Sequence, residues 1–263
     1  MKTQTRTSLT LALGAILAWA ALAATAPAAK AAETAKAGDK PLKVLFIGNS
    51  FTYYNNCPEM FKGLAAMHGK NVAVTAATNG GKDLVFQSTA ANVSQAIKAD
   101  VYDVVVIQDK VGSDFRKERF LEGCAAIVAA ARAHSPSAGL LFYEPWPTRA
   151  QLAAKTAYFT ASYLEAARQH HARLAPAAEG FYALFVNDGL DYYCRDDRHP
   201  QPLATFNSAA TIFYALFPDA PLMELDASRH QELDALINRC VAHAKEGVLP
   251  SYPLDALDKI NRY

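Results

Sequence analysis

The stretch that decides the fold is LKVLFIGNSFTYYNNCP, residues 42–58. Its first part, Leu42–Ile47, is a short apolar run that ends at Gly48. Such a run is typical of a strand buried on both faces, although periodicity alone does not exclude a buried helix. Pro58 suits the first turn of a helix, where its missing N–H leaves no bond unmade. Ser50 is therefore expected between a buried strand and a helix, at the edge where open parallel sheets bind ligands.

A serine after a strand can also be an ordinary turn residue that bonds its own backbone. The far end of the chain favours a chemical role for Ser50, because Asp196, Asp197 and His199 stand together there. A serine hydroxyl is a weak nucleophile until a base takes its proton, and a histidine titrates in the right range to do so. Asp196, three residues before the histidine, can fix the imidazole tautomer. Asp197 is the rival for that role, although an adjacent residue normally points elsewhere.

Apolar strand-like runs alternate with helical patterns along the chain. The pattern predicts strands at 42–47, 72–78, 102–107, 139–143 and 171–174, and helices at 58–68, 93–99, 117–134, 149–170, 177–185, 204–216 and 228–245. Such alternation predicts an α/β fold of three layers (α/β/α), with a flavodoxin-like parallel sheet of about five strands joined by right-handed crossovers.

Four of these strands lead directly into residues that can do chemistry. Ser50 follows the first strand, Gly80 and Gly81 the second, Gln108 the third and Glu144 the fourth. Because parallel strands end at one edge of the sheet, a hydroxyl, flexible backbone N–H groups and a side-chain amide are expected in one crevice. These are the components of an acyl-transfer site, which needs a nucleophile and donors for the oxyanion.

Aromatic residues also lie near these strand ends. Tyr53 and Trp146 are candidates for a substrate-binding wall, together with the pocket acid Glu144. The alternative for each aromatic side chain is core packing, and for Glu144 a plain loop charge.

The first residues are typical of a targeting segment. A charged start precedes an apolar stretch and small-x-small cleavage sites, which predicts a signal peptide at 1–31, followed by a flexible tether at 32–40 and a single domain at 41–263. An uncleaved anchor is the alternative, although the apolar part is short for a span of about 20 residues. We expect an exported protein, periplasmic or secreted, without stable membrane insertion after cleavage.

Composition narrows the class of partner. The chain has 26 Lys and Arg against 25 Asp and Glu, a formal net charge of +1, and no basic stripe, so nucleic acid is not an expected partner. Four cysteines in an exported chain permit disulfides, and Cys57 and Cys194, the pair near the proposed site loops, are the first to test. The four are Cys57, Cys124, Cys194 and Cys240. We expect no metal site and no cofactor; the oligomeric state is not readable.

Two common families lack support in these motifs. The order Ser, Asp, His matches the α/β-hydrolases, but Gly48-Asn49-Ser50-Phe51-Thr52 lacks the second glycine of G-x-S-x-G. The dinucleotide-binding pattern G-x-G-x-x-G is also absent after the first strand.

A strand ending in Gly-Asn-Ser, a Gly-Gly loop and a late Asp-x-x-His-Pro instead resemble the SGNH (GDSL-type) serine hydrolases. The nearest resemblance is to a bacterial branch of unknown function with FIGNSFTYYNN at its start. The resemblance spans 43–217 and implies Ser50 as nucleophile and first oxyanion donor, His199 as base and Asp196 as its partner. It implies Gly81, or else Gly80, as the second donor.

The chain departs from the family at the third strand. Gln108-Asp109-Lys110 stands where the family has a Gly-x-Asn-Asp block, whose asparagine supplies a third oxyanion donor. The amide of Gln108 is then the candidate replacement. Loss of one such donor typically costs about 100- to 1000-fold in turnover.

The resemblance implies an exported serine esterase that hydrolyses small acyl esters, acetyl esters of carbohydrates first among them. The substrate would be a small-molecule or glycan ester. One alternative is a glycan-binding module on the same fold with little or no turnover, which the departure at Gln108 motivates. Another is a structural protein of the envelope, in which Ser50 and His199 would lie far apart.

Overall fold

The computed structural model describes residues 40–186, 191 and 193–221. The predicted signal peptide, the tether before Lys40, the helix predicted at 228–245 and Cys240 lie outside these residues.

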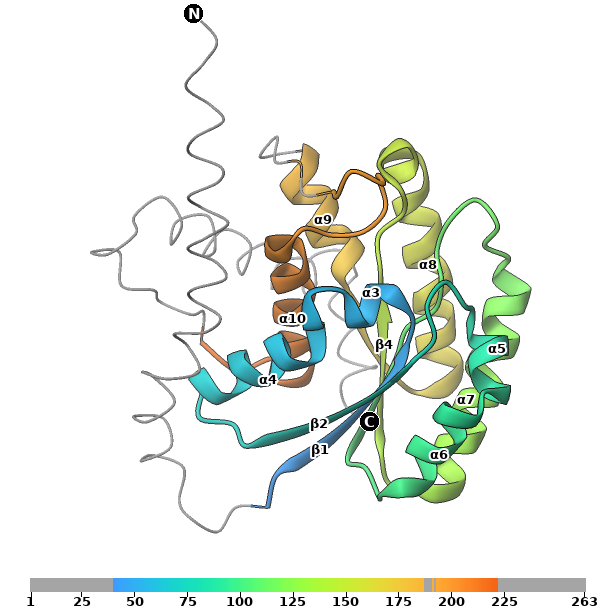
Figure 1. Cartoon of the computed structure of the whole chain (residues 1–263), viewed down its shortest axis with the longest axis vertical. Helices are drawn as coiled ribbons and strands as arrows, with labels where there is room; N and C mark the ends of the chain where they lie inside the picture. The colour runs from blue at the N-terminus through green and yellow to red at the C-terminus, as the bar shows by residue number, and fades with distance from the viewer. Residues whose placement is uncertain (1–39, 187–190, 192, 222–263) are drawn as a thin grey trace, which may run out of the picture.

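The core of the fold is a five-stranded parallel sheet (Figure 1). The order of strands across it is β2-β1-β3-β4-β5. The strands are β1 (Leu42–Gly48), β2 (Val72–Thr78), β3 (Val104–Ile107), β4 (Gly139–Glu144) and β5 (Arg173–Pro176). Gly48 pairs with Thr78 and Ile47 with Ile107, so the carboxyl ends of the first three strands are level at one edge.

Helices cover both faces of the sheet. Figure 1 shows α4 (Cys57–Met67) and α10 (Pro202–Leu216) on one side. The other side carries α5 (Leu84–Thr89), α6 (Ala91–Ala99), α7 (Lys117–His134) and α8 (Leu152–His170). The remaining described helices are α3 (Ser50–Tyr53), α9 (Ala177–Val186) and the 3₁₀ turns η1 (Tyr54–Asn56) and η2 (Arg149–Gln151).

The alternation of side chains along the strands divides the core in two. On β1, Leu45 and Ile47 pack into the cluster under α5–α8, while Val44 and Phe46 pack into the cluster under α4 and α10. All four are fully buried, as a strand covered on both faces requires. The predicted three-layer α/β/α fold is confirmed.

The differences from prediction are shifted element ends and two short helices that were not predicted. Tyr102 and Asp103 precede β3 instead of opening it, and the helix predicted from residue 149 begins with η2 before α8. Two short helices, α3 and α5, fall in segments predicted as loops. In the described part of the chain, no helix is both long enough and apolar enough to cross a membrane.

Candidate active site

The turn after β1 places Ser50 at the start of a helix. Asn49 is the N-cap of α3, and its side chain accepts a hydrogen bond from Phe51 N at 3.1 Å. A capping asparagine satisfies a first-turn N–H and so fixes where the helix begins. Ser50 is therefore the first helical residue, with 8% of its surface exposed. Its own N–H has no acceptor within the described residues, so it is free to donate to a ligand.

Gln108, directly after β3, is hydrogen-bonded to both ends of this turn. Its Oε1 accepts from Asn49 N at 2.9 Å and from Thr52 Oγ1 at 2.8 Å. Its amide nitrogen donates to Asn49 Oδ1 at 3.1 Å and to Asp109 O. Both amide hydrogens are used inside the protein, so the expectation that Gln108 donates to an oxyanion is wrong. Its role is to support the turn that carries Ser50.

Three predicted residues form one continuous chain of hydrogen bonds. His199 Nε2 lies 2.8 Å from Ser50 Oγ, and His199 Nδ1 lies 2.5 Å from Asp196 Oδ2. Asp196 Oδ1 also accepts from the backbone N–H groups of Arg198 at 3.1 Å and His199 at 2.9 Å. A hydroxyl, an imidazole and a carboxylate thus stand in the order that nucleophilic catalysis requires.

These bonds determine the charge state of Asp196. Partial burial alone would raise its pKa, but the bonds from the His199 ring and from the two backbone N–H groups lower the pKa to about 2. The carboxyl is therefore ionised at neutral pH. Since this folded value lies below the ordinary 3.8, ionised Asp196 contributes to stability above about pH 4, and this contribution is lost as the pH falls toward 2.

The rival carboxylate, Asp197, faces a different partner. Its backbone has the left-handed conformation, with φ 57°. Its Oδ1 accepts from Arg149 Nε at 2.8 Å, and its carbonyl accepts from Arg149 N at 3.0 Å. Arg149 also pairs with Asp191. Asp197 therefore anchors this loop to the segment after β4, and Asp196 is the residue that contacts the histidine.

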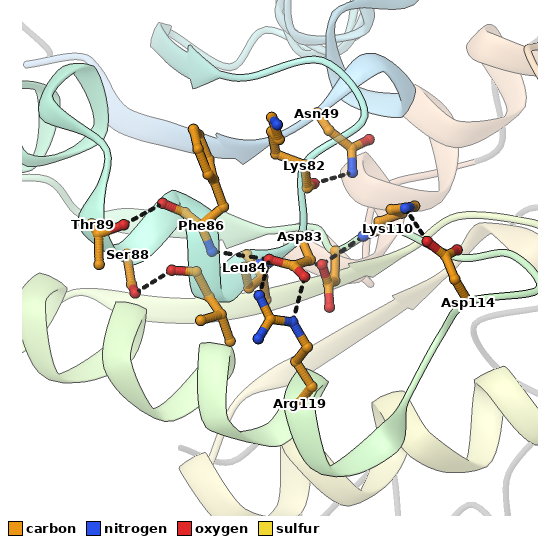
Figure 2. Close-up of polar contacts among 12 residues, drawn as sticks. Asn49, Lys82, Asp83, Leu84, Phe86, Ser88, Thr89, Lys110, Asp114 and Arg119 are labelled. Atoms are coloured by element: carbon orange, nitrogen blue, oxygen red, sulfur yellow. Dashed lines mark hydrogen bonds and ion pairs between the residues drawn. The ribbon is translucent and has the colours of Figure 1, made fainter.

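The Gly-Gly loop lies beside the serine turn and is fixed at several points. Asn49 Nδ2 donates to Lys82 O at 3.0 Å, and Leu84 N donates to Asp109 Oδ1 at 2.8 Å. Asp83 caps α5 at Phe86 N and pairs with Arg119 of α7. In Figure 2, the Asn49 side chain reaches this loop at Lys82, and the Arg119 side chain reaches it at Asp83. A loop held this way keeps its backbone N–H groups in place.

Within that loop the two glycines differ. Gly81 has φ +67°, a conformation that favours glycine, and a Cβ there would meet nothing within 4 Å. A Cβ on Gly80 would lie 2.8 Å from the hydroxyl of Tyr53. In the described part of the chain, neither glycine donates its N–H to the protein.

Asp109 is a buried carboxyl behind the Gly-Gly loop. Besides Leu84 N, its Oδ1 accepts from Lys110 N at 2.7 Å, and the Tyr163 hydroxyl accepts from its backbone N–H at 2.9 Å. Burial raises the pKa of Asp109 to about 7, although the two N–H bonds to its carboxyl favour the ionised form. Asp109 therefore titrates close to neutral pH while it holds the start of α5.

Two of the three predicted substrate-binding residues do not reach the surface. Trp146 is fully buried, stacked on Phe181 with centroids 4.5 Å apart, and it donates from Nε1 to Arg198 O at 3.2 Å. Glu144 is also fully buried, with Thr160 Oγ1 2.8 Å from its Oε1. Both side chains pack inside the protein instead of lining the crevice, so neither can contact a substrate directly. Tyr53 is 47% exposed beside Gly80 and remains a candidate.

Two residues shortly after Ser50 contact the histidine or its neighbour: Tyr54 contacts His199, and Asn55 contacts Pro200. The Tyr54 ring stacks on the His199 imidazole with centroids 4.4 Å apart and planes 10° from parallel. Asn55 Nδ2 donates to Pro200 O at 2.9 Å. The signal that could have identified Asn55 is the pair Asn55-Asn56, since asparagine tolerates the left-handed conformation that both residues adopt.

The described cysteines form no disulfide. Cys57, Cys124 and Cys194 are all free thiols, so Cys57 and Cys194, the pair singled out for a first test, are not joined. Cys57 is buried in α4, whereas Cys194 lies 3.4 Å from Pro200 O on the loop that carries the histidine. No cluster of three or more metal-binding side chains occurs among residues 40–186, 191 and 193–221.

No protein-family model and no curated protein matches the sequence. Solved structures do. A DUF4886 family protein from Bacteroides uniformis is similar with a TM-score of 0.63 at 14% identity, over 83% of this chain and 99% of that one. A protein described as a GDSL-like lipase from Parabacteroides merdae has a TM-score of 0.52 at 16% identity, over 67% of this chain and 96% of that one.

An acetyl-xylooligosaccharide esterase from Geobacillus stearothermophilus has a TM-score of 0.50 at 15% identity, over 70% of this chain and 96% of that one. Together these neighbours agree with the predicted fold, that of the SGNH hydrolases. At such low identities the likeness concerns the fold alone.

Proposed function

We propose that this chain is an exported serine esterase that hydrolyses small acyl esters, with acetyl esters of carbohydrates as the favoured substrate class. The observation that carries the proposal is the hydrogen-bonded chain from Ser50 Oγ to His199 Nε2 at 2.8 Å and from His199 Nδ1 to Asp196 Oδ2 at 2.5 Å. Export rests on the sequence pattern of residues 1–31.

In the first half of the reaction, His199 Nε2 takes the proton of Ser50 Oγ as this oxygen attacks the ester carbonyl. The carbonyl oxygen becomes an oxyanion, and the imidazole becomes an imidazolium that ionised Asp196 stabilises. The imidazolium then gives its proton to the leaving alcohol, and an acyl-Ser50 remains. In the second half, His199 deprotonates a water that attacks this ester and then returns the proton to Ser50 Oγ as the acid leaves.

The oxyanion would be held by backbone N–H groups. Ser50 N–H has no acceptor in the described chain, and Gly81 N–H is the preferred second donor, with Gly80 as its alternative. Because Gln108 uses its amide inside the protein, no side-chain donor is assigned. Absence of one donor typically costs about 100- to 1000-fold in turnover, so we expect a slow enzyme on generic esters.

The substrate class rests on the neighbours and on one exposed side chain. One neighbour is an acetyl-xylooligosaccharide esterase. Tyr53 exposes 47% of its surface beside the Gly-Gly loop and could stack on the apolar face of a sugar ring.

The test is hydrolysis of p-nitrophenyl acetate by the mature protein beside Ser50→Ala and His199→Ala, with fluorophosphonate labelling of Ser50. We expect turnover and labelling by the wild type only, with all three proteins folded. A panel of acetylated glycans then defines the substrate. Absence of both turnover and labelling in the wild type would instead favour a glycan-binding module, the reading that the missing third donor supports.

A further inference from the structure

The bonds between Asp196 and His199 do not by themselves fix the distance from the His199 ring to Ser50. Both residues belong to the histidine loop, Tyr193–Gln201, and lie three positions apart. Their bond orients the imidazole within that loop, but it moves with the loop. Ser50 is 149 positions away in the sequence, so the distance from Oγ to Nε2 must be set by contacts between the two segments.

Asn55 supplies such contacts through its side-chain amide. Nδ2 donates to Pro200 O at 2.9 Å, next to the histidine, and to Thr205 Oγ1 of α10 at 2.8 Å. Its backbone is left-handed, with φ 49° and ψ 20°, which turns the side chain back from the end of α3. One amide group therefore links the segment of Ser50 to the histidine loop and to the helix that follows it.

Tyr54 holds the imidazole from its face. The two rings are nearly parallel, and Phe51 packs near the same imidazole with centroids 5.9 Å apart. A ring stacked on another cannot rotate about its χ2 without losing that contact. The stack therefore restricts the plane in which Nε2 can point at Ser50.

A second set of contacts holds the loop from the segment after β4. Trp146 Nε1 donates to Arg198 O at 3.2 Å, and Arg149 binds Asp197. These residues lie beyond β4 and do not belong to the segment of Ser50. The contacts of Tyr54 and Asn55 differ because they start four and five residues after the nucleophile.

We propose that Tyr54 and Asn55 are positioning residues for His199, Asn55 by anchoring the histidine loop and Tyr54 by fixing the plane of the ring. The inference rests on the proposed function. Misplacement of a catalytic group by about 1 Å can cost on the order of 100-fold in rate, so these contacts matter for turnover even where they matter little for folding.

The chain offers a matched control for Asn55. Asn56 is also left-handed, with φ 59°, but its side chain is exposed and makes no capping bond. Glycine fits both positions without strain. We expect Asn55→Gly to lower kcat for p-nitrophenyl acetate by about 10- to 100-fold with KM little changed. Asn56→Gly should stay within about twofold of the wild type, since it removes no contact to the loop.

Tyr54 is tested by a conservative pair. Tyr54→Phe keeps the stacked ring and should keep kcat within about threefold of the wild type, whereas Tyr54→Leu should lower kcat by about tenfold, because it removes the ring stacked on the imidazole. The rate of fluorophosphonate labelling at Ser50 should fall in parallel. This readout reports activation of the serine and needs no natural substrate.

Amide hydrogen exchange of peptides from the histidine loop separates this inference from the proposed function. Faster exchange there in Asn55→Gly, but not in Asn56→Gly, is expected whether or not the wild type hydrolyses esters. Equal exchange in the two variants overturns the anchoring role. Equal kcat in Tyr54→Leu and Tyr54→Phe overturns the role of the ring.

If Asn55→Gly does not fold, Asn55→Asp removes the donor to Pro200 O and is read the same way. A wild type that neither turns over nor labels contradicts only the proposed function.

Discussion

Asp196 and Asp197 are adjacent, chemically identical side chains, and their contacts separate their roles. Asp196 receives three hydrogen bonds, two from backbone N–H groups and one from the ring of His199. Asp197 is held by Arg149. Sequence spacing was enough to favour Asp196. It could not show the bond to Arg149, because that depends on where the segment after β4 passes.

Exchange of each carboxylate for its amide tests this difference. In Asp196→Asn, the amide oxygen should keep the two backbone N–H bonds, so its NH₂ group faces His199 Nδ1. The ring would then carry its proton on Nε2 and could not accept the proton of Ser50. We expect kcat to fall by about 100- to 10,000-fold. Asp197→Asn is the control and should lose less than about threefold, because an exposed ion pair contributes little and the bond from Arg149 N to the Asp197 carbonyl still anchors the loop.

Glu144 allows a second test at the residue scale. Complete burial raises the pKa of Glu144 well above its usual value, and nearby Glu179 raises it further, although the bond with Thr160 favours ionisation. The folded protein therefore retains a proton that the unfolded chain loses above about pH 4.5. Stability must fall as pH rises from that value toward the folded pKa.

Glu144→Gln removes this dependence, because an amide does not titrate. We expect its free energy of unfolding to gain on that of the wild type by up to about 1.4 kcal/mol per pH unit above pH 4.5. Urea unfolding of both proteins at pH 5 and pH 8 measures the gain. A constant difference between the two pH values would mean that Glu144 is ionised in the folded protein. Esterase activity should not change, because the carboxyl lies outside the crevice.

At the scale of elements, the patterns of apolar residues predicted those strands and helices whose burial in the core is written locally in the sequence. The strand 72–78 was predicted with its observed ends, and so was the helix 117–134, because buried runs and helical periods are local signals. The helices α3 and α5 were missed. Each is too short to show a period, and each begins at a cap, Asn49 or Asp83, that works only where the neighbouring loop folds over it.

The candidate site was likewise predicted in part. The residues that touch one another in a short motif, such as Asp196 and His199, could be paired from spacing. The directions of the Gln108 and Trp146 side chains could not be predicted, since a polar or aromatic residue at a strand end can point to the crevice or into the core. Only the packing of the neighbouring loops decides between the two.

The contact between α5 and α7 gives a prediction for elements. A Cβ on Gly123 would lie 2.5 Å from Leu84 Cβ and 2.8 Å from the Val85 nitrogen, so Gly123→Ala must push α5 away. We expect a loss of about 1–3 kcal/mol in the free energy of unfolding. Leu84 also holds the Gly-Gly loop through Asp109, so ester hydrolysis should fall as well.

Gly63 is the matched control for this substitution. It lies exposed in α4, and a Cβ there would meet nothing within 4 Å. Gly63→Ala should stabilise the protein by about 0.5–1 kcal/mol, because alanine is the better helix former. Urea titration of both variants measures the two changes. Equal effects would show that α5 and α7 do not pack as closely as the structure has them.

At the scale of the whole molecule, the level carboxyl ends of the strands bring distant loops to one edge. Ser50 follows β1, the Gly-Gly loop follows β2 and Gln108 follows β3, while the histidine loop arrives from beyond β5. No disulfide joins these loops in the described part of the chain, where the three thiols are free. Packing and hydrogen bonds therefore hold the site together.

Thiol labelling tests this account. Cys57 and Cys124 are buried in α4 and α7, and burial raises the pKa of both thiols, that of Cys57 to about 12. We expect neither to react with an alkylating reagent at neutral pH until the protein unfolds, whereas half-buried Cys194 should react slowly in the folded state. Peptide mass mapping under non-reducing conditions should find no Cys57–Cys194 link, and detection of one would contradict the structure.

The separation of Ser50 from His199 by 149 positions has a consequence for biogenesis. During synthesis Ser50 leaves the ribosome long before His199, so an unfinished chain carries the serine without its histidine partner. We expect the pair to form as α10 docks beside α4, because Thr205 of α10 and Pro200 of the histidine loop bond the same Asn55 amide. The proposed hydrolytic activity would thus report completed folding. On refolding from denaturant, we expect turnover to return after the helical signal does, with the docking of the last described helix.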